Sequence, residues 1–199
     1  MSLFSHVDEK GSAVMVDVTE KDVTYRMARA GGLIHMNGSA LKAVSEGSAA
    51  KGDVLAAARI AGIMAAKKTS DLIPLCHPLQ LTKVSIDLEV CPDRGYIRCE
   101  CEVRLMGKTG AEMEALTGVS VALLTIYDMC KALDKAMVIS DISLKEKDGG
   151  RSGHFIPDPV PEHKDHIEII KEEKQIKTEK GDLNENKEEP DKKGIQIGW

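Results

Sequence analysis

An apolar stretch with ionisable residues at both ends is the part of this sequence best suited to acid–base chemistry. The segment 107–131 (GKTGAEMEALTGVSVALLTIYDMCK) carries Glu112 and Glu114 near its start and Asp128 and Lys131 at its end. A charged side chain on a core-facing helix is costly unless it is paired or used. These four residues are therefore the first candidates for proton transfer.

Asp128 and Lys131 are spaced to act together, since residues three apart share a helix face. The plain interpretation is an ordinary surface ion pair, which contributes well under ~1 kcal/mol to stability. The almost wholly apolar residues between Leu116 and Met129 instead indicate a half-buried pair with perturbed pKa values. Glu114 falls near the same face, yet a rise of ~1.5 Å per residue places it about 21 Å from Asp128. If both helix ends are functional, the site is shared between subunits.

Two further residues have a chemical and a plain interpretation. His77 lies in a proline-punctuated segment with Lys67 and Lys68 nearby in sequence. Rigid loops of this kind often display functional side chains, so it is a candidate for phosphate binding or proton transfer. Lys51 stands just before a predicted helix. On spacing alone, the favoured interpretation is that Lys51 is solvated and that Asp53, two residues later, is the N-cap of the helix.

The glycine-flanked turn 107–110 (GKTG) resembles the end of a phosphate-binding loop. A P-loop needs glycine five positions before the Gly-Lys pair, and position 102 is Glu, so that interpretation fails. Two alternatives stay open. A turn that opens a helix can present backbone N–H groups to an anion, or it can simply connect a strand to a helix.

The cysteines predict reduced thiols rather than disulfides or a metal centre. Their number is odd, and no pair has the C-x₂₋₄-C spacing of a zinc site. Cys99 and Cys101 share one strand face, which favours small buried side chains. No metal and no cofactor is predicted. The five are Cys76, Cys91, Cys99, Cys101 and Cys130.

Composition excludes several classes of protein. The 199 residues are 42% hydrophobic, enough for one domain with a core, and the net charge of -5 comes without a basic block, which argues against nucleic-acid binding. No charge-free apolar run approaches ~18 residues, so no membrane span is predicted. The N-terminus (MSLFSHVDEKGS) lacks the pattern of a signal peptide, which predicts a cytoplasmic protein.

The last quarter of the chain differs from the rest. Residues 157–199 contain 8 Lys and 12 Asp and Glu, with few aliphatic residues. Such a segment buries too little apolar surface to offset the cost of ordering, so we expect a charged, disordered tail after a domain that spans 1–156.

The elements that must position the candidate residues alternate between strand and helix patterns. From residue 24 onward the order is β-α-β-β-α-β, which predicts an α+β, ferredoxin-like sandwich with its helices packed on one face of an antiparallel sheet. The sheet's other face must then be polar or covered by a partner. The expected elements are a strand at 13–18, an extended segment at 23–36 bent at Gly31-Gly32, a helix capped by Ser39 and running to about 46, a helix capped by Asp53 and running to about 68, an irregular segment at 70–81, a hairpin of 83–90 with 96–106, a helix at 111–133 and a strand at 137–147.

Two long segments, 51–84 and 107–133, closely resemble the MoaC family of molybdenum cofactor biosynthesis. The similarity also takes in 15–18, the strand that carries Arg26, and 149–155 (GGRSGHF). The resemblance implies a lyase that converts 3′,8-cyclo-7,8-dihydro-GTP to cyclic pyranopterin monophosphate with release of pyrophosphate. It also implies a homohexamer built of dimers, with active sites between subunits.

The resemblance assigns roles residue by residue. Asp128, Lys51 and Lys131 match catalytic residues of the family. Its substrate-binding segments match Leu75, Cys76, His77, Glu112, Met113 and Glu114, and further functional positions match Arg26, Lys67 and Asp17. A non-enzymatic ferredoxin-like module that binds a nucleotide or metabolite is the competing hypothesis. A tail that contacts RNA is disfavoured by the tail's net negative charge.

Overall fold

The computed structural model describes residues 7, 10–49, 51–150 and 153–158. The predicted tail lies outside the described residues from position 159 onward, so its disorder stays a prediction.

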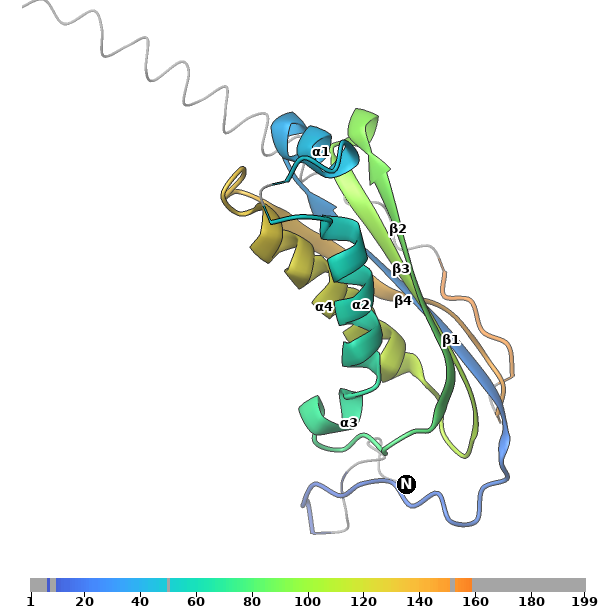
Figure 1. Ribbon diagram of the computed structural model, residues 1–199. Coiled ribbons are helices and arrows are strands. Elements are labelled where there is room, and N and C mark those ends of the chain that lie inside the picture. The colour runs from blue at the N-terminus through green and yellow to red at the C-terminus, as the bar shows by residue number, and fades with distance from the viewer. Residues whose placement is uncertain (1–6, 8–9, 50, 151–152, 159–199) are drawn as a thin grey trace, which may run out of the picture. The chain divides into compact units, whose positions relative to one another are not determined.

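Four antiparallel strands form one sheet in the order β2-β3-β1-β4, and two helices cover one of its faces (Figure 1). This confirms the predicted α+β sandwich, because the long helices fall between β1 and β2 and between β3 and β4. The elements are β1 (Thr24–His35), α1 (Gly38–Ser45), α2 (Val54–Ala66), α3 (Thr69–Leu72), β2 (Leu81–Cys91), the 3₁₀ helix η1 (Pro92–Arg94), β3 (Tyr96–Gly107), α4 (Glu112–Cys130) and β4 (Val138–Asp148).

The core lies between the sheet and the α2–α4 pair. Along β3 the buried side chains alternate with half-exposed ones, and in β1 Ala28, Ala30 and Ile34 are buried next to half-buried residues such as Arg29 and Leu33. Cys99 and Cys101 point into this core, where burial raises the pKa of both thiols to about 12. All five cysteines are free, as predicted.

Helix α4 is the one helix in the described part of the chain that is long and apolar enough to cross a membrane, with a mean hydropathy of 1.3. Its packing accounts for that composition. The helix lies across β1, β3 and β4 on one side and against α2 on another, and residues such as Val119, Leu123 and Ile126 are fully buried there.

Three local predictions are wrong: the strand at 13–18, the cap of the first helix, and the start of the irregular segment at 70–81. Residues 14–18 form no strand, because Val14 and Met15 are exposed and the carbonyl of Val16 bonds a side chain instead of a neighbouring strand. The first helix is capped by Asn37, not Ser39, since the Asn37 side chain accepts a hydrogen bond from Ala40 N.

The segment expected to be irregular opens with the short helix α3 and becomes irregular only from Ile73, next to Pro74. The cap at Asp53 is confirmed, as its side chain accepts from Ala56 N. The bend at Gly31-Gly32 is confirmed as well, because the pairing of β1 with β4 shifts register there.

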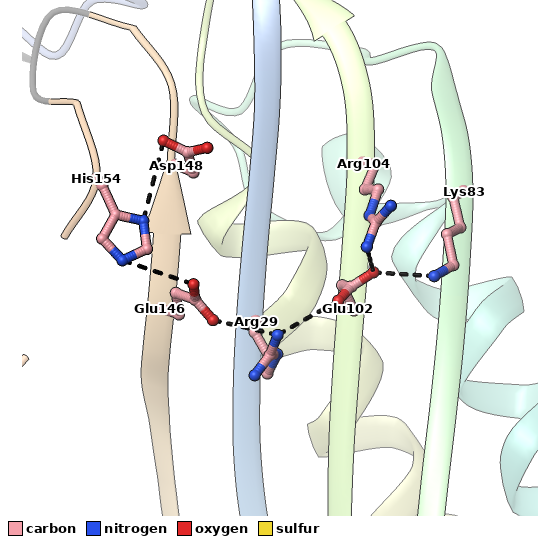
Figure 2. Close-up of polar contacts among 7 residues, drawn as sticks. All are labelled: Arg29, Lys83, Glu102, Arg104, Glu146, Asp148 and His154. Carbon is pink, nitrogen blue, oxygen red and sulfur yellow. Dashed lines mark hydrogen bonds and ion pairs between the residues drawn. The ribbon is translucent and has the colours of Figure 1, made fainter. Parts of the chain in front are cut away.

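The face of the sheet away from the helices carries a row of linked charges (Figure 2). Glu102 on β3 lies 2.7 Å from Arg104, 3.0 Å from Lys83 and 3.5 Å from Arg29. Arg29 reaches on to Glu146 of β4 at 3.1 Å. The face predicted to be polar or partner-covered is thus polar, and its cross-strand pairs tie all four strands together.

Helices α2 and α4 are in close backbone contact where Gly62 faces Gly118. A Cβ atom at Gly62 would lie 2.8 Å from the carbonyl oxygen of Gly118 and 2.9 Å from Ile86 Cδ1. Neither neighbour has room to withdraw, because one is helix backbone and the other is packed in the core. The helix spacing therefore depends on glycine at this crossing.

We expect Gly62→Ala to lower the free energy of unfolding by about 1–3 kcal/mol through overpacking. This loss should appear even though alanine favours an isolated helix by about 1 kcal/mol over glycine. Gly38→Ala is the matched control, since no atom lies within 4 Å of a Cβ there. Urea unfolding of both variants measures the difference, and equal stabilities would show that the crossing relaxes freely.

Candidate active site

One end of α4 brings together the three residues expected to be catalytic. Lys51, from the turn before α2, places Nζ 2.9 Å from both the carboxylate and the main-chain carbonyl oxygen of Asp128. Lys131, one position beyond α4, places its Nζ 2.7 Å from the other carboxylate oxygen. Asp128 thus accepts from two ammonium groups supplied by separate elements. Spacing alone favoured a solvated Lys51, and the structure shows it paired.

The cluster of Lys51, Asp128 and Lys131 is more exposed than predicted. The Asp128 side chain keeps 59% of its surface accessible, so the expected half-buried pair is wrong for this chain by itself. Asp128 lies in the last turn of α4 on its solvent-facing side, whereas Cys130 in the same turn is fully buried. The pKa values of the pair are nevertheless perturbed, as expected. Hydrogen bonds from Lys131 and Lys51 lower the pKa of Asp128 to about 2, and Asp128 raises the pKa of Lys131.

The other end of α4 carries a different kind of carboxyl group. Glu114 lies in the first turn and is 4% exposed, and its burial raises its pKa to about 7. Glu112, two residues earlier, lies 3.0 Å from Lys147 at the end of β4. Met113 between them is exposed. A carboxyl group with a pKa near neutrality is suited to both accepting and donating a proton.

The loop after α3 reaches this same end of α4. Burial, and then the nearby charge of Glu114, raise the pKa of Cys76. His77 Nε2 lies 2.8 Å from the carbonyl oxygen of Val16, which joins the loop to the N-terminal segment. Leu75 is half-buried beside them in sequence. The segment expected to bind substrate therefore meets the start of α4.

Asp17 and Lys67 belong to this end of the fold as well. Asp17 accepts from Thr19 N at 2.8 Å, and its hydrogen bonds with Thr19 lower its pKa, with a smaller effect from Lys108. Lys67 is the C-cap of α2. Because α2 starts beside Asp128 and passes Gly118, it runs antiparallel to α4, so Lys67 lies toward the start of α4.

Arg26 lines a pocket beside the start of α4, and the pocket contains cations that the sequence patterns did not identify. Its volume is about 180 Å³, and its walls include Glu112. Arg26 donates from Nε to the carbonyl oxygen of Gly107 at 3.4 Å. The newly found lining residues are Lys21, Lys108, Lys147 and Asp148. The one available signal was the glycine-flanked turn 107–110 that carries Lys108, for which anion binding by backbone N–H groups and a plain connection both stayed open.

Glycine is required at position 150 above Arg26. The backbone there has a φ of +74°, and a Cβ would collide with the Arg26 guanidinium. Gly149 is required as well, because its φ is +96° and a Cβ there would collide with the backbone carbonyl oxygen of Tyr25; both positions of the Gly-Gly pair after β4 are thus explained.

We expect the burial of Glu114 to make stability fall as pH rises. Between about pH 4.5 and 7 the unfolded chain releases this proton while the folded chain retains it, so the free energy of unfolding decreases across that window. The shift corresponds to a loss of about 3 kcal/mol. Glu114→Gln should remove that part of the pH dependence, measured by urea unfolding at fixed protein concentration.

Glu46→Gln is the matched control for the Glu114 experiment, because Glu46 is exposed at the C-cap of another helix, α1. The slope of its free energy of unfolding against pH should match that of the unchanged protein. An identical slope in Glu114→Gln would contradict the burial effect.

The predicted site residues therefore form two groups, one at each end of α4. Fourteen residues separate Glu114 from Asp128, which at ~1.5 Å per residue is about 21 Å. The two groups do not meet within one chain. Fold and site together define an α+β sandwich protein with an ammonium–carboxylate cluster at one end of a core helix and a cationic pocket at the other.

The chain belongs to the MoaC family, whose model matches residues 15–150. It is 62% identical over 152 residues to proteins of Mycobacterium bovis and Mycobacterium tuberculosis, each named cyclic pyranopterin monophosphate synthase 1. The alignments cover 76% of this chain and 88% of each relative.

Proposed function

We propose that this protein is a cyclic pyranopterin monophosphate synthase, a lyase of molybdenum cofactor biosynthesis. Its substrate is 3′,8-cyclo-7,8-dihydro-GTP, and its products are cyclic pyranopterin monophosphate and pyrophosphate. The observation that carries the proposal is the cluster of Lys51, Asp128 and Lys131, in a chain 62% identical to relatives named for this activity. The rearrangement needs several proton transfers, and this cluster supplies donors for them.

Asp128 and its two lysines have different roles in the proposed proton transfers. With a pKa of about 2, Asp128 is a carboxylate at neutral pH and a weak base. It holds the ammonium groups of Lys51 and Lys131 in fixed directions, ready to donate protons. Once a proton has left, the neutral lysine amine is the stronger base of the set. We therefore assign the transfers to the lysines and the orientation to Asp128.

The opposite end of α4 fits the phosphate chemistry. Closing the cyclic phosphate joins a sugar hydroxyl oxygen to the α-phosphorus, breaks its bond to the bridging oxygen and frees the hydroxyl proton. Negative charge then develops on the departing pyrophosphate, and cations stabilise it. Arg26, His77 and Lys67 belong to this end, and Glu114 is able to accept the proton.

We assign the complete active site to two subunits, as the homohexamer of dimers implied by the resemblance requires. A pocket of about 180 Å³ is smaller than the roughly 300–1,000 Å³ of most small-molecule sites. The outer faces of α2 and α4 also expose Ile60, Met64 and Leu124 at 53–60%. We infer that a second copy covers these side chains with its α4 antiparallel to the first, so that the start of one α4 lies toward Asp128 of the other. We also propose that the protein is cytoplasmic.

The test is turnover of the cyclised nucleotide by the purified protein. We expect release of pyrophosphate together with a product that gives a fluorescent pterin derivative after oxidation. Binding of the nucleotide without either signal would favour the non-enzymatic alternative, a module that senses a metabolite.

A further inference from the structure

The turn that carries Lys131 is held by hydrogen bonds rather than by packing. Residues 131–133 follow α4 directly, and the side chains of all three are exposed. After Cys130, the next buried side chain along the sequence is that of Met137. The ends of helices fray when nothing restrains them. Whatever fixes this turn therefore also fixes the direction from which Lys131 reaches Asp128.

Asp134, the residue after the turn, joins it to the chain that leaves β1. Its Oδ2 accepts from the main-chain N–H of Asn37 at 2.7 Å, and its Oδ1 accepts from that of Ala136 at 2.9 Å. Asn37 Nδ2 in turn donates to the carbonyl oxygen of Leu133 at 3.3 Å. Hydrogen bonds to a carboxylate are stronger than those between neutral groups. These contacts form what we call the Asp134–Asn37 clamp.

Asn37 is itself well held, so the clamp has a fixed point of attachment. It is the N-cap of α1, and its side chain accepts from Ala40 N at 2.9 Å. The preceding Met36 is buried and donates its N–H to the carbonyl oxygen of Gly95 at 3.0 Å. Strand β1, which ends two residues before Asn37, pairs with β3 on one side and β4 on the other. Figure 1 shows α1 at the same end of the fold as the end of α4. Asp134 therefore ties the turn to an interior strand of the sheet.

We propose that Asp134 is a positioning residue of the candidate active site, which holds the turn after α4 against Asn37 so that the Lys131 ammonium group stays directed at Asp128. The effect on turnover rests on the proposed function, whereas the effect on the geometry of Lys131 does not. Lys51 reaches Asp128 from a separate element, the turn before α2, and has its own anchorage. Neither the sequence patterns nor the family resemblance singled out Asp134.

Turnover should depend on Asp134 through kcat. We expect Asp134→Ala to lower kcat about tenfold with KM within about twofold, because a small misplacement of a proton donor slows the reaction without removing a binding contact. Asp134→Asn keeps one of the two acceptor oxygens and should recover part of the loss. Asp87→Ala, which removes an exposed carboxylate of β2, is the matched control and should leave kcat unchanged. Steady-state pyrophosphate release measures these values.

Competitive acetylation of the full chain reports the position of Lys131 without requiring turnover. The hydrogen bond with Asp128 raises the pKa of Lys131, which keeps its amine protonated and slow to react with acetic anhydride. In Asp134→Ala, Lys131 should be acetylated several-fold faster relative to Lys42, the internal reference on α1. Mass spectrometry of the peptides gives this ratio. A residue that only stabilises the fold would lower Tm and leave the ratio unchanged.

The two measurements separate the clamp from the proposed function. An unchanged acetylation ratio in Asp134→Ala would overturn the clamp, whether or not kcat falls. A raised ratio with unchanged kcat would overturn the role of Asp134 in the reaction. A raised ratio in a protein without turnover would support the clamp and count against the proposed function. If thermal unfolding shows that Asp134→Ala does not fold, Asp134→Asn is tested in its place, with a smaller rise in the ratio expected.

Discussion

Lys51→Ala is expected to lower kcat by about 10²- to 10⁴-fold while the fold survives. Lys51 lies outside the helices, 47% of its side chain is exposed, and its ammonium group donates hydrogen bonds to Asp128. Its removal therefore leaves the core intact and takes away one of two proton donors. Steady-state pyrophosphate release measures the loss, and circular dichroism with thermal unfolding checks the fold. Full activity of Lys51→Ala would remove Lys51 from the mechanism.

Two companion variants show whether Lys51 transfers a proton or only supplies charge. Lys51→Arg keeps the positive charge but does not give up its proton at working pH. It should stay as inactive as Lys51→Ala if proton transfer is the role, and recover activity if charge alone matters. Lys42→Ala is the matched control, because Lys42 is also an exposed lysine paired with a carboxylate, Glu46, away from the site. Its kcat should not change.

The fold was largely predictable because its elements have strong local patterns. The alternation in 83–90 and 96–106 specifies strands with one buried face, and the apolar run after Glu112 specifies a core helix. Prediction failed where side chains from distant parts of the chain satisfy the backbone. Val16 and Thr19 give their carbonyl oxygens to His77 and Lys108, and no local pattern encodes such partners.

The site was predictable only in part, for a related reason. Asp128 and Lys131 share a helix face, so their pairing follows from spacing. Lys51 is 77 positions from Asp128 and meets it only because α2 packs antiparallel on α4. The family resemblance, not spacing, assigned Lys51 a role. Lys21 and Lys147 were missed altogether, since isolated lysines in charged segments carry no signal of a pocket.

The candidate residues at the two ends of α4 differ in exposure, and a site shared by two subunits would bring them together. Asp128 stays open to solvent in the single chain, while Glu114 is buried beside a small cationic pocket about 21 Å away. In a two-fold dimer each surface patch meets its counterpart reciprocally. One site would then combine Glu114 of one subunit with Asp128 of the other.

Mixing the inactive variants Glu114→Ala and Asp128→Ala should therefore restore activity. Random exchange makes half of the dimers mixed, and each mixed dimer has one site with both residues intact, so about a quarter of the full activity should return. Glu114→Gln, which keeps the side-chain volume, replaces Glu114→Ala if that variant is unstable. Subunit exchange is verified by mass spectrometry of the assembled oligomers.

The control for this mixture pairs Lys51→Ala with Asp128→Ala. Lys51 and Asp128 contact each other within one chain, so every site in that mixed dimer lacks one of them and no activity should return. Recovery in the control would mean that the cluster itself is assembled between subunits. No recovery in the Glu114–Asp128 mixture, with exchange verified, would mean that the two ends of α4 do not serve one site. The 21 Å between them would then separate the catalytic cluster from residues that take no part in its site.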